Sequence, residues 1–197
     1  MTRRLVASLC AMVMIGGCAR PHAPMGPPQK PAQSAEVKKL SRLAGSWTGT
    51  AEMVSPSAEE MQAVMPEGSN EKVQTTFAFG GKLDWALGGL FLKGEGWYEM
   101  GEGLKANYVE YWTWDPKAQK YRIWSFTDWG ESSAGWAKFT DANTMWMESE
   151  GWDGEGYKMS STGTMTFVDD NTHNWTITMK SDQTGKMVMK GTAKKQK

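Results

Sequence analysis

Short segments of alternating apolar and polar residues, each ended by a turn, run from Gly45 to the end of this 197-residue chain and limit its fold most. Such alternation places successive side chains on opposite faces of a β-strand. The breaks come about every 8–12 residues, the spacing typical of an antiparallel sandwich or barrel. Several breaks are explicit turn sequences, among them Asp115 to Lys120, Asp141 to Asn143 and Asp153 to Gly156.

The alternating pattern predicts ten strands. They are Ser46–Val54, Lys72–Phe79, Phe91–Met100, Lys105–Trp114, Tyr121–Asp128, Ser133–Phe139, Thr144–Gly151, Tyr157–Val168, His173–Lys180 and Met187–Ala193.

The connections favour one all-β domain over residues 35–197. Nearly every strand is joined to its sequence neighbour, so an antiparallel up-and-down, lipocalin-like barrel of about 8–10 strands leaves no free edge. A β-sandwich is the alternative. Apolar residues spaced by three, at Val37, Leu40 and Leu43, predict a short helix before the first strand. Residues 57–65 are expected to form a short helix or flap.

The N-terminus predicts export and lipidation. Arg3 and Arg4 precede a short apolar run, and small residues then lead to Cys18, as in a secretory signal. We therefore expect residues 1–17 to be a signal peptide, Cys18 to carry lipid, and residues 18–34, which are rich in proline, to form a tether. The membrane is then a partner through that lipid, and the expected place is the cell envelope, on the periplasmic side of the outer membrane if the host has two membranes.

Cysteine and charge exclude several functions. Cys10 would leave with the signal and Cys18 would carry lipid, so the folded domain would have no thiol for a disulfide, a nucleophile or a metal. Removing Arg3 and Arg4 from 22 basic residues leaves 20 against 22 acidic ones, a net charge of −2. This balance does not favour nucleic acid as a partner.

Tryptophan is the unusual residue of the domain, with 11 in the chain. On three predicted strands, tryptophan and glutamate share one face. We take as candidate ligand-binding residues the following set from these faces: Trp97, Tyr108, Glu110, Trp112, Trp114, Trp146, Glu148, Glu150 and Trp152.

The direction of these faces is open, because periodicity gives the face of a side chain but not which face is inside. If they point inward, they either fill the barrel or line a pocket for a small apolar or amphiphilic ligand. If they point outward, they suit a structural or protein-interaction role. An enzyme using Glu148 and Glu150 as acid and base is a third hypothesis, without any catalytic residue assigned.

Other chemistry is weakly indicated, and no cofactor or metal is expected. His173 is interpreted as a solvated turn residue, with haem or metal ligation as the alternative. Methionines of the C-terminal strands are interpreted as adaptable core side chains, with copper(I) binding as the alternative. They are Met145, Met147, Met159, Met165, Met179, Met187 and Met189.

Four motifs carry a family resemblance. They are Leu43 to Gly49 (Leu-Ala-Gly-Ser-Trp-Thr-Gly), Leu87 to Leu92, Trp114 to Tyr121 and Asp169 to Thr172. Together, over about Leu40 to Ala193, they resemble the bacterial domain of unknown function family 1579, whose members are similar to lipocalins and other calycin barrels. The resemblance implies that Trp47 plugs the closed end of a barrel. It implies no reaction.

From these observations we expect a lipid-anchored envelope protein that binds a small apolar or amphiphilic ligand in a β-barrel without catalysis.

Overall fold

A computed structural model describes residues 31–56, 75–99 and 104–197. The predicted signal peptide, Cys18 and nearly all of the tether, as well as the helix or flap expected at 57–65, lie outside these residues. Ala32–Lys197 forms one compact unit.

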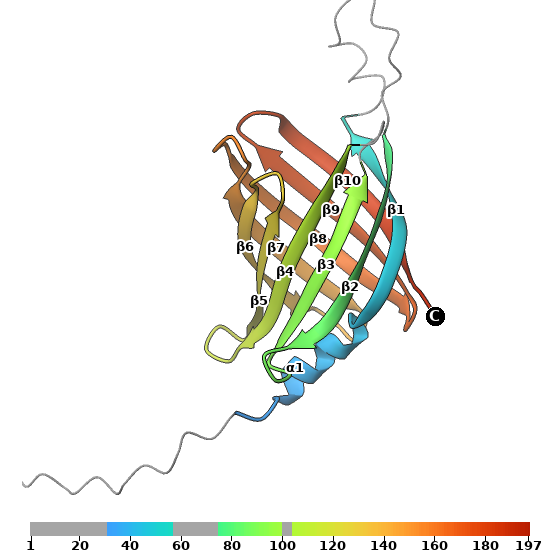
Figure 1. The fold of residues 1–197 in the computed structure, drawn as a ribbon, viewed down its shortest axis with the longest axis vertical. Coiled ribbons are helices and arrows are strands. Elements are labelled where there is room, and N and C mark those ends of the chain that lie inside the picture. The colour runs from blue at the N-terminus through green and yellow to red at the C-terminus, as the bar shows by residue number, and fades with distance from the viewer. Residues whose placement is uncertain (1–30, 57–74, 100–103) are drawn as a thin grey trace, which may run out of the picture. The chain divides into compact units, whose positions relative to one another are not determined.

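The sheet of this unit is a closed antiparallel barrel in which each strand pairs with its sequence neighbours and β1 pairs with β10 (Figure 1). The strands are β1 Gly45–Ser55, β2 Thr76–Ala86, β3 Phe91–Glu99, β4 Lys105–Asp115, β5 Lys120–Thr127, β6 Ser132–Phe139, β7 Thr144–Trp152, β8 Lys158–Asp169, β9 Thr172–Ser181 and β10 Gly185–Lys195. The predicted all-β up-and-down barrel is therefore confirmed, and the sandwich alternative is wrong.

The largest error in the predicted strands is in β2. The sequence predicts a strand over Lys72–Phe79, of which residues 72–74 lie outside the described residues, whereas β2 runs on to Ala86, through Gly80 and Gly81. The glycines are not a break. A Cβ at Gly80 would meet the ring of Trp97 at 3.2 Å, and one at Gly81 would meet Tyr108 Oη at 2.8 Å. Glycine here makes room for large side chains of other strands on each face of the sheet.

A short helical segment precedes β1, as the spacing of apolar residues predicts. It consists of α1 Ala35–Lys39 and the 3₁₀ turn η1 Leu40–Arg42. Ser34 Oγ caps α1 by accepting a hydrogen bond of 3.2 Å from Val37 N. Figure 1 shows α1 lying at the end of the barrel from which β1 starts. Within the described residues, no helix is long and apolar enough to cross a membrane.

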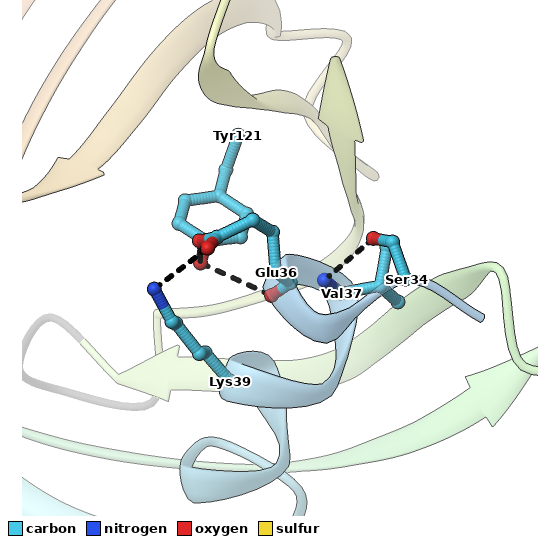
Figure 2. A network of polar contacts seen from close by, with 5 residues as sticks. All are labelled: Ser34, Glu36, Val37, Lys39 and Tyr121. Atoms are coloured by element: carbon cyan, nitrogen blue, oxygen red, sulfur yellow. Dashed lines mark hydrogen bonds and ion pairs between the residues drawn. The ribbon is translucent and has the colours of Figure 1, made fainter. Parts of the chain in front are cut away.

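Polar contacts tie the helical segment to the barrel. Tyr121 of β5 donates a hydrogen bond of 3.1 Å to the carbonyl of Glu36, whose carboxylate pairs with Lys39 at 2.8 Å (Figure 2). Arg42 Nη1 donates to the carbonyl of Ala142 in the β6–β7 turn at 2.7 Å. The segment is thereby tied to β5 and to the β6–β7 turn.

Candidate functional site

The end of the barrel beside α1 is sealed by apolar packing; we call it the closed end. Leu40 of η1 and Leu43, which caps η1, are buried in one cluster with side chains from six strands. Trp47 is buried beside them, and its Nε1 donates a hydrogen bond of 2.7 Å to the carbonyl of Leu43. This is the closing position that the family resemblance implies for Trp47.

The buried cluster also shows which face of every strand points inward. Leu92, Trp112, Tyr121, Ala137 and Met145 are buried members from β3 to β7. Residues directly opposite in the strand register share a face, and so do residues two apart on one strand. Each strand of the closed barrel pairs with two neighbours, so these two rules can be followed from strand to strand. They identify the inward-facing residues of all ten strands.

The opposite end, which we call the mouth, has no such apolar seal among the residues that the structure describes. Inward-facing residues of its half, including Phe77, Tyr98, Ile177, Met179 and Met187, are half-buried although strands surround them on all sides. Side chains that face the inside of a barrel keep solvent contact only if solvent enters. The described residues therefore enclose a lumen that is closed by the helical segment and that none of them seals at the mouth.

One wall of the lumen is lined by methionine. Every methionine noted in the sequence of the C-terminal strands faces inward, and Met53 of β1 joins them. Toward the mouth, Met179 pairs with Met187 and Met53 pairs with Met189. Met145, Met147 and Met165 belong instead to the packed cluster at the closed end. Methionine is flexible and polarisable, so such a wall adapts to apolar bodies of various shapes.

The facing wall, on β4 to β6, is polar. Glu110 stands opposite Ser125, which stands opposite Ser133, and Tyr108 stands opposite Thr127, all facing inward. From the level of Glu110 to the mouth, Glu110 is the only charged side chain on the inward faces of the described strands.

Glu110 lies deep in the barrel on a surface free of side chains. Its Cγ and Oε1 lie 2.6 and 2.7 Å from where a Cβ at Gly94 would be, and Tyr108 Oη lies 2.5 Å from such a position at Gly96. None of the ion pairs within the described residues includes Glu110. Burial raises the pKa of its carboxyl to about 7, and the nearby Trp112 indole opposes this rise. Burial and the Glu110 charge also raise the pKa of Tyr108.

Two buried nitrogens have no hydrogen-bond partner among the described residues, Nε1 of Trp112 and Nδ1 of His173. Trp112 is 5% exposed, and its indole lies near enough to Glu110 to affect its pKa but not in the geometry of a hydrogen bond. An unpaired buried donor is uncommon and calls for an explanation. The Trp112 N–H lies on the same strand face as the Glu110 carboxylate and the Tyr108 phenol. This part of the wall therefore has more hydrogen-bonding groups than the described residues pair with one another.

His173 corrects the sequence interpretation. It is 6% exposed, not solvated, and its ring lies 4.6 Å from that of Trp47 and 5.8 Å from that of Phe167. Burial lowers its pKa to about 4, so the ring is neutral at pH 7. No group of three or more His, Cys, Asp or Glu side chains able to hold a metal occurs in the described part of the chain.

The candidate residues from the sequence divide between the two faces of the barrel. Tyr108, Glu110, Trp112 and Trp114 point inward, the two tryptophans near the closed end. The others, Trp97, Trp146, Glu148, Glu150 and Trp152, point outward.

The outward residues make surface contacts of their own. Lys105 lies over the ring of Trp97 at 4.7 Å and Lys120 over that of Trp146 at 5.5 Å. Glu148 and Glu150 each lie 3.8 Å from a lysine. Glu150 lines a depression at the rim of the barrel together with inward Met159 and Ser181, and Glu148 is not part of that lining. Because both glutamates point outward, the acid–base pair considered from the sequence is not assembled in the lumen.

Sequence reasoning missed the inward residues Phe79 and Trp175. Their rings lie 5.7 Å apart, and Trp175 lies against Gly191 of β10. Alternation with His173 and Ile177 on β9 is the signal that places Trp175 on the inward face.

The outer rim of the mouth is marked by exposed aromatic side chains. Phe126, Trp129, Trp152 and Tyr157 are 42–57% exposed. They lie at the mouth ends of β5 and β7 and in the β5–β6 and β7–β8 connections. A depression of about 470 Å³ lies farther along the rim, where inward Met159 and Ser181 meet lysines of β8 to β10.

Comparison with known proteins gives no family. No family model matches the sequence, and no curated protein matches it. The resemblance to the domain of unknown function family 1579 thus stays a prediction. One similar solved structure is described as "Structure of EF1p2_mFAP2b bound to DFHBI". It has 10% identity and a TM-score of 0.44, covering 81% of this chain and 98% of that chain.

Proposed function

We propose that this protein binds and carries a small amphiphilic ligand, without catalysis, in the lumen of its barrel. The observation that carries the proposal is the contrast between the two halves of the barrel interior. The closed end is packed and buried around Leu40 and Trp112, whereas enclosed apolar side chains nearer the mouth, such as Met179 and Met187, stay half-buried. Concave apolar walls with a few polar groups are the usual form of a small-molecule site.

Ligand occupancy is tested with N-phenyl-1-naphthylamine, a neutral apolar dye whose fluorescence rises in apolar surroundings. We expect saturable binding and quenching of protein fluorescence by energy transfer. Among the 11 tryptophans, Trp175 stands in the middle of the lumen. Trp175→Phe should therefore change the dye affinity by several-fold, because it alters a wall of the site.

Trp146→Phe is the matched control. Trp146 is also half-buried on a strand but faces outward beneath Lys120, so the substitution should leave dye affinity unchanged. Failure of the dye to bind, or equal effects of the two substitutions, would remove the support for a lumen site.

We further propose that lipid on Cys18 holds the mature protein at the cell envelope. The basic, apolar and small-residue order before Cys18 supports this, and two or three acyl chains suffice for stable anchoring. Metabolic labelling with a radioactive fatty acid tests it. The native protein should be labelled and partition with membranes, and Cys18→Ser should lose the label.

A second candidate function, contact with a lipid surface, is favoured by the exposed aromatics at the mouth. Aromatic rings with a polar edge are enriched where proteins meet the membrane interface. Trp152→Ser with Tyr157→Ser should reduce sedimentation of the unacylated protein with phosphatidylcholine vesicles. Leu87→Ser is the control, since Leu87 is 69% exposed but lies in the β2–β3 turn at the closed end. No sedimentation of the unsubstituted protein would reject this candidate.

A further inference from the structure

We infer that the ligand carries a protonated amine, and that this head binds at Glu110 and Tyr108 deep in the lumen while the apolar body lies along the methionine wall toward the mouth. This inference rests on the proposed function, because it assigns a ligand class to the same lumen.

The first support is the isolation of the Glu110 carboxylate. From its level to the mouth, no other inward-facing side chain of the described strands is charged, and the Glu131 carboxylate in the β5–β6 connection accepts a hydrogen bond of 3.2 Å from inward Tyr98. A carboxylate inside a protein is normally paired with a cation or satisfied by hydrogen bonds, because desolvation of an unpaired charge is costly. The described inward faces offer Glu110 no lysine or arginine at this depth, so a cationic group from a ligand would supply the missing partner.

The second support is the surface on which the carboxylate lies. Gly94 and Gly96 of β3 and Gly81 of β2 carry no side chain, and Glu110 and Tyr108 occupy the space that their Cβ atoms would fill. The glycines let both polar side chains lie close to the sheet. At these positions β2 and β3 therefore add no side chain to the lumen.

The third support is the unpaired indole of Trp112, one inward position closer to the closed end than Glu110. Its buried Nε1–H makes no hydrogen bond of good geometry among the described residues, although the indole lies near enough to Glu110 to oppose the rise in the pKa of that carboxyl. Tyr108 as donor or acceptor, Glu110 as acceptor and Trp112 as donor thus occupy three successive inward positions of β4. An ammonium head meets the carboxylate and the phenol oxygen, and a neighbouring oxygen of the same ligand meets the indole N–H.

The fourth support is the distribution of polarity around the barrel. The polar wall belongs to β4 to β6, and the methionine wall belongs mainly to β8 to β10, on the other side of the closed sheet. A molecule with one polar head and an apolar body satisfies both walls together. An anionic amphiphile would instead place like charge against Glu110.

Displacement of bound N-phenyl-1-naphthylamine tests this assignment at pH 8. The competitors are dodecylamine, dodecanol and dodecanoate, which share a chain and differ in the head. We expect dodecylamine to bind the native barrel at least tenfold more tightly than dodecanol, and dodecanoate to bind most weakly. In Glu110→Gln the preference for the amine over the alcohol should disappear, with dye affinity retained.

Glu148→Gln is the matched control, because Glu148 is a half-buried strand glutamate on the outer face; it should keep the preference. Equal affinity for the amine and the alcohol in the native barrel would overturn the inference, as would a preference that survives in Glu110→Gln. Either result leaves dye binding intact. Loss of dye binding in the native protein would instead contradict the proposed function. The preference of the native protein for dodecylamine over dodecanol is measured without any variant. It therefore tests the inference even if Glu110→Gln fails to fold.

Discussion

The Glu110 side chain lies directly against the bare backbone of Gly94 on the neighbouring strand, with Cγ 2.6 Å from the position that a Cβ there would take. Gly94 and Glu110 are opposite one another in the β3–β4 register. Cross-strand neighbours on one face normally share the space above the sheet. Here Glu110 occupies the whole of this space, because Gly94 has no side chain. The position of Glu110 in the lumen therefore depends on glycine at position 94.

Gly94→Ala should therefore displace Glu110 without unfolding the barrel. The alanine methyl would collide with a side chain that can rotate, and overpacking of this kind costs roughly 1–3 kcal/mol. We expect a loss of that size in the free energy of unfolding, measured in urea, together with weaker binding of dodecylamine.

Gly80→Ala provides the comparison for that substitution. Gly80 points to the outer face, where an added Cβ would meet the Trp97 ring at the less severe distance of 3.2 Å. Gly80→Ala should lower the free energy of unfolding by less than Gly94→Ala does, and it should leave the affinity for dodecylamine unchanged. Equal binding losses at the two positions would mean that Gly94 does not act through Glu110.

The hydrogen bond from Trp47 to Leu43 gives a second prediction, about the closed end. Trp47→Phe keeps an aromatic ring beside His173 but leaves the buried Leu43 carbonyl without its 2.7 Å donor. An unsatisfied buried acceptor costs about 1–3 kcal/mol, and removal of part of the ring adds to this. We expect a lower urea midpoint with an unchanged slope.

The outward Trp146→Phe is the reference for this measurement, and it should change stability by no more than about 0.5 kcal/mol. Equal effects of Trp47→Phe and Trp146→Phe would contradict the assignment of Trp47 to a structural seal.

Packing of Leu40 gives a third prediction. Leu40 is fully buried at the junction of α1 and η1, within the cluster that fills the closed end. Leu40→Ala should cost about 2–5 kcal/mol, as truncations of buried leucine do. Ser41→Ala, at the adjacent exposed position of η1, should cost far less. Thermal unfolding of the two variants checks this, and similar midpoints would show that the helical segment does not seal the barrel.

The strands could be predicted from the sequence because alternation and turn residues are local signals. β4 and β7 show why the site could not be predicted to the same degree. Each carries tryptophan and glutamate on one face, yet that face points inward on β4 and outward on β7. A period of two fixes which residues go together, but the side that faces the core depends on pairing around the whole barrel.

Two local errors have the same origin. Gly80 and Gly81 resemble a turn in the sequence, but they lie in β2 because bulky side chains of other strands cover them on each face. His173 follows the β8–β9 turn, and its burial comes from Trp47 and Phe167, which are distant in sequence or on the neighbouring strand. Contacts between strands decide both cases, and no local signal in the sequence reports them.

The pH dependence of stability gives the last prediction, because two buried titrating groups inside the barrel, His173 at the closed end and Glu110 in the lumen, should act in opposite directions. His173 has a pKa lowered to about 4, so its contribution is complete above pH 6.5 and is lost as the pH falls through 4. Glu110 has a pKa raised to about 7, so its contribution is complete below pH 4.5 and is lost as the pH rises through 7. Each displacement corresponds to roughly 3 kcal/mol at most, less for Glu110 because its side chain keeps some solvent contact.

Between about pH 4.5 and 6.5 the two effects oppose each other in the native protein. Free energies of unfolding in urea, measured across pH 4–8, should separate them once each variant is subtracted from the native protein, since titration of all other groups then cancels. The native protein should lose stability relative to Glu110→Gln as the pH rises, and gain it relative to His173→Leu over the same range. If both differences were constant with pH, neither group would have the displaced pKa that its burial in the barrel requires.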